Sequence, residues 1–182
     1  MEAPVIETER FRLRSAELRD FDAYADMWAD DRTTAFIGGG RGRTRQEAWY
    51  RFLGQPGLWA MLGYGYWVFA DRASDLFIGC GGFASWERGV PALEGYPEAG
   101  WAIAPAWWGK GAASEIMAAA LGWADGALGG DETRCIIDHG NAASLRVAER
   151  LGYRRQGDVA LADGLTTLWS RRREGAAQNP ST

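Results

Sequence analysis

Cysteine and histidine are scarce in this chain of 182 residues, which has two cysteines, Cys80 and Cys135, and one histidine, His139. A structural zinc site takes four cysteine or histidine ligands, so these side chains cannot form one, and we expect no metal site. Both thiols fit a role as small apolar strand residues in a reducing cytoplasm. We therefore expect a cytoplasmic protein whose core does not depend on disulfides.

The chain also lacks a long hydrophobic segment. Its first residues, MEAPVIETERF, have no basic start followed by an apolar stretch, which argues against a signal peptide. One uncharged run of 19 residues, 52–70, approaches the roughly 20 residues of a membrane helix. Gly54, Pro56 and Gly57 interrupt this run at intervals that disfavour a single helix, and the last part of the run alternates like a strand. We expect no membrane span.

There is no excess of positive charge either, because 20 Lys and Arg face 24 Asp and Glu and the net charge is −4. Nucleic-acid binding needs clustered positive charge, so we expect no nucleic-acid partner. Apolar residues make up 47% of the chain, which at this length indicates one globular domain. Glycine, with 25 residues, has about twice its average usage, and tryptophan, with 10, is also abundant.

Hydrophobic spacing predicts strands and helices in alternation. Residues 10–14 alternate like a strand, and residues 21–28 carry aromatic side chains at helical spacing. Thr44 followed by Glu47 has the spacing of a capping box, which predicts the start of a second helix. Further strands are expected at 66–70, 76–83, 98–103, 134–138, 153–159 and 165–170, and further helices at 112–128 and 141–151. The order β-α-α-β-β-β-α-β-α-β-β predicts an α/β fold (α+β mixed sheet) with helices on both faces.

Glycines separate the strand at 98–103 from the helix at 112–128, in the run Trp108-Gly-Lys-Gly-Ala-Ala-Ser114. The first amides of a helix have no partners within it, and glycines before them leave room for a phosphate. Two other phosphate loops fit less well. The nearest P-loop has Arg43 in place of lysine, and the dinucleotide pattern finds Ser114 at its third glycine. A glycine-rich connection without a ligand stays open as an alternative.

This loop, the order of elements and the segment Asn141-Ala-Ala-Ser-Leu-Arg-Val-Ala-Glu-Arg-Leu-Gly-Tyr153 together resemble the GNAT superfamily of acetyl-CoA-dependent N-acetyltransferases. Within it, the opening Glu7-Thr-Glu-Arg-Phe-Arg-Leu-Arg14, the Pro-x-x-Trp-Gly-Lys-Gly run and Asn-x-x-Ser resemble the branch containing the ribosomal-protein alanine N-acetyltransferases. The resemblance implies a GNAT-like fold whose fourth and fifth strands, 98–103 and 134–138, splay apart and leave a wedge for acetyl-CoA.

The resemblance also implies which residues bind the donor. Backbone amides of residues 109–114 are expected to bind its pyrophosphate. Lys110 could add a charge near the phosphates or be solvated, and Asn141 could bind the pantetheine arm or only cap its helix. A main-chain amide around 102–104, freed by a bulge in the strand, is expected to stabilise the oxyanion. The full set expected to bind acetyl-CoA is Ile103, Trp108, Gly109, Lys110, Gly111, Ala112, Ala113, Ser114 and Asn141.

Two side chains are expected to take part in proton transfer. Glu98 matches the acidic residue of the family's E-x-G strand segment, so it is the expected proton acceptor for the amine. The alternative is an exposed strand residue or a salt-bridge partner, with Glu94, Asp138 and His139 in reserve. The family often has a tyrosine seven residues after the asparagine, beside the leaving thiolate. That position is Ala148 here, so the hydroxyl of Ser144 is expected to take its place.

The sequence therefore predicts one N-acetyltransferase domain over residues 1–170, acting on a primary amine of a protein N-terminus or a small molecule. Two alternatives stay open: an acetyl-CoA-binding regulator without turnover, and a non-catalytic nucleotide-binding or interaction module. Members of the family often dimerise, so a homodimer is compatible with the resemblance. The amine site is expected among aromatic residues, with Trp59, Trp67 and Trp86 as candidates. Residues 171–182 begin with three arginines and end in small polar residues, which predicts a flexible tail.

Overall fold

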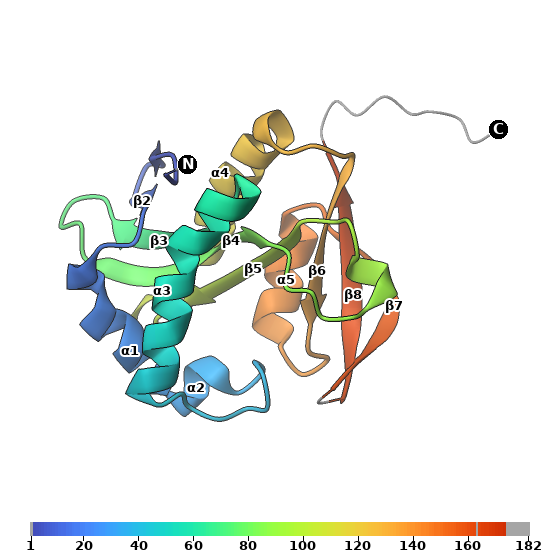
Figure 1. The fold of residues 1–182 in the computed structure, drawn as a ribbon, viewed down its shortest axis with the longest axis horizontal. Helices are drawn as coiled ribbons and strands as arrows, with labels where there is room; N and C mark the ends of the chain where they lie inside the picture. The colour runs from blue at the N-terminus through green and yellow to red at the C-terminus, as the bar shows by residue number, and fades with distance from the viewer. Residues whose placement is uncertain (1, 163, 174–182) are drawn as a thin grey trace.

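The strands form one mixed sheet in the order β1-β2-β3-β4-β5-β6-β8-β7, as seen in a computed structural model that describes residues 2–162 and 164–173 (Figure 1). The strands are β1 (Ile6–Glu7), β2 (Phe11–Arg14), β3 (Tyr66–Asp71), β4 (Phe77–Ala84), β5 (Glu98–Ile103), β6 (Glu132–Ile137), β7 (Arg154–Leu161) and β8 (Gly164–Arg172). The α-helices are α1 (Phe21–Ala29), α2 (Asp31–Thr34), α3 (Arg45–Leu62), α4 (Ala112–Ala127) and α5 (Ala142–Arg150). Short 3-10 helices are η1 (Leu18–Asp20), η2 (Pro91–Leu93) and η3 (Pro105–Trp107).

The expected mixed α/β fold is confirmed, with the short elements β1 and α2 added to the expected order. The capping box at the start of α3 forms as its spacing predicts. The Glu47 amide lies 3.2 Å from the Thr44 hydroxyl, and the Thr44 amide donates to the Glu47 carboxylate at 2.8 Å. These contacts satisfy two amides that the first turn of a helix leaves without partners.

The expectation that glycine and proline would break this region was wrong, because α3 continues through Gly54, Pro56 and Gly57 to Leu62. These three residues all lie on the exposed side of the helix, whereas Phe52 is buried on the other side. Burial of that side stabilises the helix despite the amide that proline lacks. Among the described residues, no helix is both long enough and apolar enough to cross a membrane.

Helices cover both faces of the sheet, and the alternation of β5 decides which residue faces which layer. Ile103 packs in one cluster with Ile116 of α4 and Ala148 of α5. Its neighbour Ala102 packs in a second cluster with Phe52 of α3. Figure 1 shows α1 and α3 with the β2–β5 half of the sheet and β6, β8 and β7 forming the other half.

The two halves of the sheet separate between β5 and β6, as expected. β5 pairs with β4 over six residues, 98–103, but within the described chain it shares a single parallel pair with β6, Glu98 with Arg134. The strands diverge after that pair and leave a wedge that opens toward Ile103 and Ile137. The expected bulge is not observed, because residues 79–84 of β4 pair one-for-one with β5.

The connection 85–97 between β4 and β5 reaches across to the second half of the sheet. Val90, which precedes η2, and Leu93, the last residue of η2, pack against Leu168 of β8. Arg134 of β6 holds the same connection, since it donates to the Ala92 carbonyl and its guanidinium carbon lies 3.4 Å from the centre of the Tyr96 ring. This connection therefore covers the sheet on the face that Glu98 also occupies.

The sheet extends further along the chain than the expected domain end at 170. β8 continues through Arg172, and both η nitrogens of Arg171 donate to the Asp125 carboxylate at 2.8 and 2.7 Å. The first residues of the expected tail thus belong to the fold, because this ion pair ties them to α4. Residues 174–182 of that expected tail lie outside the described residues.

Candidate active site

The backbone of β5 forms one wall of the wedge. In an antiparallel pair the N–H groups of successive residues point to opposite sides of the strand. The Ala104 amide donates to the Ile78 carbonyl at 2.8 Å, so the amides of Ala102 and Ala104 point toward β4. Those of Trp101 and Ile103 then point toward β6, beyond the last pair that β5 makes with that strand.

Only part of the range 102–104, where the oxyanion donor is expected, faces the wedge. Divergence of the strands, not a bulge, leaves amides facing the wedge, and within the expected range 102–104 only the Ile103 amide faces it. The amide of Trp101 faces it as well and was missed, because the side to which an amide points depends on register, which periodicity does not give. The Trp108 indole donates to the Ile103 carbonyl at 2.6 Å and fixes the end of the strand.

The glycine loop lies at the carboxyl end of β5. Gly109 and Gly111 have φ values of +72° and +76°, in the left-handed region that favours glycine, and Gly111 is the N-cap of α4. The amides of the first turn, 112–114, have no carbonyl partner within the helix and carry the positive end of its dipole. Lys110 is exposed, and its ammonium nitrogen lies 5.1 Å from the centre of the Trp107 ring. The loop therefore presents an anion-binding surface beside the wedge.

The other wall of the wedge is formed by β6 and the start of α5. Asn141 is the N-cap of α5, and its Oδ1 accepts from the Ser144 amide at 3.1 Å. The cap uses the oxygen of Asn141 and leaves its Nδ2 group as a donor. Ser144 is half-buried in the first turn, whereas Ala148 is fully buried in the core. Of the candidates on this side, Ala148 is a packing residue, whereas Asn141 and Ser144 are half-buried at the start of α5.

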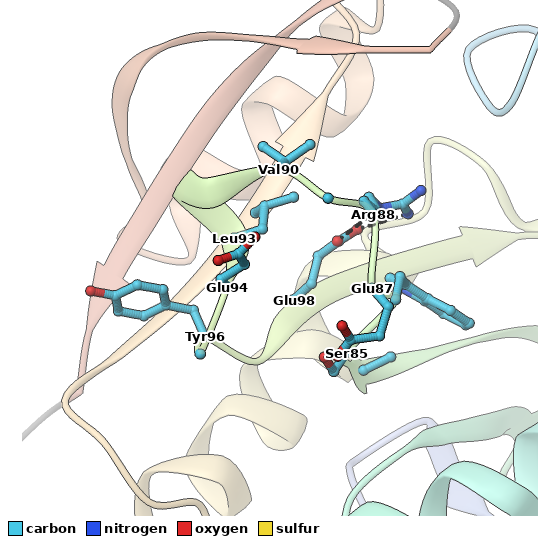
Figure 2. A pocket seen from close by; sticks show the side chains of 12 residues that line it. Ser85, Glu87, Arg88, Val90, Leu93, Glu94, Tyr96 and Glu98 are labelled. Atoms are coloured by element: carbon cyan, nitrogen blue, oxygen red, sulfur yellow. Dashed lines mark hydrogen bonds and ion pairs between the residues drawn. The ribbon is translucent and has the colours of Figure 1, made fainter.

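Glu98 begins β5 and is paired with a side chain that the sequence did not single out. Nε and Nη2 of Arg88 each lie 3.0 Å from one carboxylate oxygen of Glu98, whose side chain is 9% exposed. Figure 2 shows Glu98 pointing from the strand to Arg88 on the covering loop, while Tyr96 points away from Glu98. The salt-bridge alternative for Glu98 is thus observed, so an amine that reaches the carboxylate competes with Arg88 for its oxygens.

A cavity of about 320 Å³ lies under the connection 85–97, with Glu98 in its lining. Its other charged lining residues are Glu87, Arg88 and Glu94, so carboxylates outnumber the guanidinium by three to one. Trp86 also lines it and is exposed. The cavity therefore combines aromatic surface with negative charge, which suits a cationic amine.

Tyr66 and Gly100 form a further part of the site. They lie on the same face of the sheet as Glu98, and the Tyr66 hydroxyl occupies the space that a Cβ on Gly100 would need. Burial and then the negative charge of Glu98 raise the pKa of Tyr66, so its hydroxyl keeps its proton. The Tyr66 ring lies 5.5 Å from the Trp86 ring, edge to face. Tyr66 therefore links the strand to the cavity.

Several other candidates lie elsewhere. Trp59 and Trp67 are buried with Trp123 in an aromatic core cluster and do not line the cavity. Asp138 accepts from the Gly140 amide at 2.7 Å, and Nε2 of His139 lies 3.4 Å from Asp158. Asp138 and His139, the two reserve candidates in the turn before α5, are therefore already paired within the protein. Within the described residues, no group of three His, Cys, Asp or Glu side chains could hold a metal ion.

A mixed sheet that splits between β5 and β6, with the start of α4 at the carboxyl end of β5, defines an α/β domain with a wedge in its sheet. The family model for the acetyltransferase (GNAT) domain matches residues 10–154. The chain therefore belongs to the GNAT acetyltransferase family, as the sequence resemblance implied. Membership makes it an N-acyltransferase, in a family whose members use acetyl-CoA.

Individual relatives agree over nearly the whole chain. A structure from Bordetella pertussis described as a GNAT-family acetyltransferase has 34% identity and a TM-score of 0.80, covering 93% of this chain and 99% of that one. The uncharacterized N-acetyltransferase YoaA of Bacillus subtilis is 24% identical over 85% of each chain. The ribosomal-protein-S5-alanine acetyltransferase of Vibrio fischeri has 20% identity and a TM-score of 0.74, covering 95% and 98%, and shares the fold.

Proposed function

We propose that this protein transfers the acetyl group of acetyl-CoA to a primary amine of a protein N-terminus or a small molecule. One observation carries the proposal: two amides of β5, those of Trp101 and Ile103, face a wedge that leads to Gly111, the exposed N-cap of α4. An extended thioester with a pyrophosphate at one end matches that arrangement in shape and in hydrogen-bonding groups.

The direction of the donor in the wedge follows from the position of the glycine loop. The loop follows the carboxyl end of β5, so a pyrophosphate held by amides 109–114 lies nearer to Ile103 than to Trp101. A pantetheine arm bound in this direction would run back along β5 past Ile103, where Nδ2 of Asn141 would be a donor to it. The thioester would then lie beside Trp101, three residues from Glu98.

When bound, the donor supplies an activated acetyl thioester, and the chain supplies three groups around it. The Trp101 amide donates to the carbonyl oxygen, where negative charge develops. Glu98 accepts a proton from the ammonium ion that displaces Arg88, and the neutral amine that results attacks the thioester carbonyl. The second proton of the nitrogen leaves with the thiolate, which departs as CoA thiol. The Ser144 hydroxyl donates a hydrogen bond to the leaving sulfur. Placement of the amine beside the thioester lowers the barrier further, because the two reacting groups are already oriented.

The cavity under the connection 85–97 supports an amine as acceptor. Amines arrive mostly as ammonium ions, and Glu87 and Glu94 give the approach to Glu98 a negative potential. The ammonium replaces the Arg88 guanidinium with the same charge, so Glu98 is not left without a cation as the acceptor enters. An acceptor that carries a carboxylate in place of the ammonium would not match the charge of Arg88.

Binding and turnover are tested separately. Calorimetric titration is expected to show binding of CoA but not of ATP or NAD, and absence of CoA binding overturns the proposal. Release of CoA thiol is then followed with a panel of small amines and of peptides with free N-termini, which separates the two acceptor classes. Burial raises the pKa of Cys80 to about 12 and also raises that of Cys135, so protein thiols should contribute little to the signal. Binding without turnover on any amine favours the regulator.

A further inference from the structure

The segment before β2 is joined to the start of α4 across more than a hundred positions of the sequence. The Thr8 hydroxyl donates to Oε1 of Glu115 at 2.7 Å, and the Arg10 amide donates to the same oxygen at 3.1 Å. Nε of Arg10 donates to Oε2 at 2.7 Å, and Nη2 lies 2.7 Å from that oxygen. Residues of the opening motif thus converge on one carboxylate in the first turn of α4.

Arg10 also contacts the glycine loop itself. Its Nη1 donates to the Lys110 carbonyl at 2.9 Å, and its Nη2 lies 3.6 Å from the position that a Cβ would take on Gly111. The Arg10 side chain is 45% exposed. A cation therefore lies open to solvent beside the amides that face the proposed pyrophosphate.

Charge explains why this position matters for a phosphate ligand. A carboxylate in the first turn stabilises a helix, but it repels an anion bound at the same end. Burial alone would raise the pKa of Glu115, and the hydrogen bonds from Thr8 and Arg10 bring it below its ordinary value, so the carboxylate stays charged. Arg10 neutralises that charge where it would oppose binding.

We propose that Arg10 is a positioning residue for the donor: it fixes the glycine loop through the Lys110 carbonyl and offsets Glu115 beside the bound pyrophosphate. This inference rests on the proposed function. An ordinary surface ion pair would contribute little and would not affect the ligand. Here one guanidinium binds both the carboxylate and the loop, so its loss should act on the affinity for CoA.

The test measures the dissociation constant of CoA by calorimetry for the full chain and its variants. Arg10→Met is expected to weaken CoA binding about tenfold at about 50 mM salt, the effect of losing one charge-assisted contact. At about 500 mM salt the ratio to the unaltered protein should decrease, because salt screens the part of the effect that comes from charge and leaves the part that comes from the contact with the Lys110 carbonyl. Arg10→Lys should recover most of the low-salt affinity. A purely structural role predicts a ratio that does not change with salt and no recovery with lysine.

Arg12→Met is the matched control, since Arg12 lies on β2 and pairs with Glu7 and Asp75 at 2.9 and 3.1 Å, away from the loop. It should leave CoA binding unchanged at both salt concentrations. If Arg10→Met does not fold, Glu115→Gln decides: it removes the repelling charge and should tighten CoA binding about threefold at low salt. Equal binding by the unaltered protein and Arg10→Met, or weaker binding by Glu115→Gln, overturns the inference alone. Absence of binding by the unaltered protein overturns the proposed function with it.

Discussion

Arg88 and Glu98 form a two-point ion pair in which each of two guanidinium nitrogens lies 3.0 Å from a different carboxylate oxygen. Arg88 comes from the covering connection 85–97, and Glu98 begins β5 at the point where the sheet splits. The pair therefore joins the connection above the cavity to the start of β5. A cationic acceptor that enters the cavity competes with Arg88 for the same carboxylate.

Replacement of Glu98 by glutamine is expected to lower kcat about 10²- to 10⁴-fold, because the amide cannot accept the proton that the amine loses. The KM for acetyl-CoA should change little, since Glu98 lies away from the glycine loop. Steady-state rates measured from about pH 6 to about pH 9 check this. Glu149→Gln, on the exposed side of α5, is the control. Equal rates for Glu98→Gln and the unaltered protein at every pH would remove Glu98 as the base.

Replacement of Arg88 by methionine leaves the buried Glu98 carboxylate without two hydrogen bonds. The free energy of unfolding is expected to fall by about 1–3 kcal/mol, the usual cost of an unsatisfied buried acceptor. Urea denaturation measures the loss. Arg19→Met, whose side chain is 56% exposed in its own ion pairs, should cost less. Similar losses for both variants would show that Arg88 acts as an ordinary surface residue.

Local signals in the sequence were sufficient for much of the fold. The capping box at Thr44 and Glu47 predicted the start of α3, and the glycine run and Asn141 predicted the starts of α4 and α5, because these signals involve neighbours in sequence. The interior of α3 was misjudged at Pro56, because burial of the opposite side of a helix depends on the sheet it packs against. Local preference was overridden by packing at that point.

Long-range register accounts for what was missed in the site. Tyr66 meets Gly100 only because β3, β4 and β5 pair in one register, and Arg10 meets Glu115 only because β2 lies next to α4. Hydrophobic periodicity carries no information on such partners. The wedge itself was expected from the family resemblance, whereas the proposal that the Trp101 amide is the oxyanion donor needed the direction of each amide.

Alanine at Gly100 is expected to destabilise the protein by about 1–3 kcal/mol, because its Cβ would take the place of the Tyr66 hydroxyl. In Tyr66→Phe/Gly100→Ala that hydroxyl is gone and the next atom, Cζ of residue 66, lies 3.2 Å away, so part of the loss should be recovered. Thermal unfolding of the single and double variants measures this. Gly54→Ala, on the exposed side of α3 with open space around it, should not destabilise. Additive losses in the double variant would contradict the steric explanation.

Alanine at Gly111 is expected to weaken CoA binding by about tenfold, because φ of +76° costs an L-residue about 1–2 kcal/mol and relaxation would turn the amides of the loop. A Cβ there meets no atom closer than 3.6 Å, so strain and not a clash is the cause. Calorimetry with CoA measures the change. Gly122→Ala, within α4 and with open space around it, should stabilise the helix and leave binding unchanged. Unaltered CoA binding by Gly111→Ala would place the phosphates elsewhere.

Glu47 should make the stability of the protein depend on pH in the acid range. A hydrogen bond from Arg41 and then the Thr44 amide lower the pKa of Glu47 to about 2 from its ordinary 4.5. Because the folded pKa is the lower one, the stabilisation is complete above about pH 4.5 and is lost as the pH falls toward about 2. Glu47→Gln keeps the geometry of the capping box and removes the charge, so it should unfold at lower urea than the unaltered protein at pH 7. That difference should shrink between about pH 4.5 and about pH 2, and Arg41→Met should follow the same trend. A difference in urea midpoint that stays constant across this range would show that the Glu47 carboxylate contributes through its shape and not its charge.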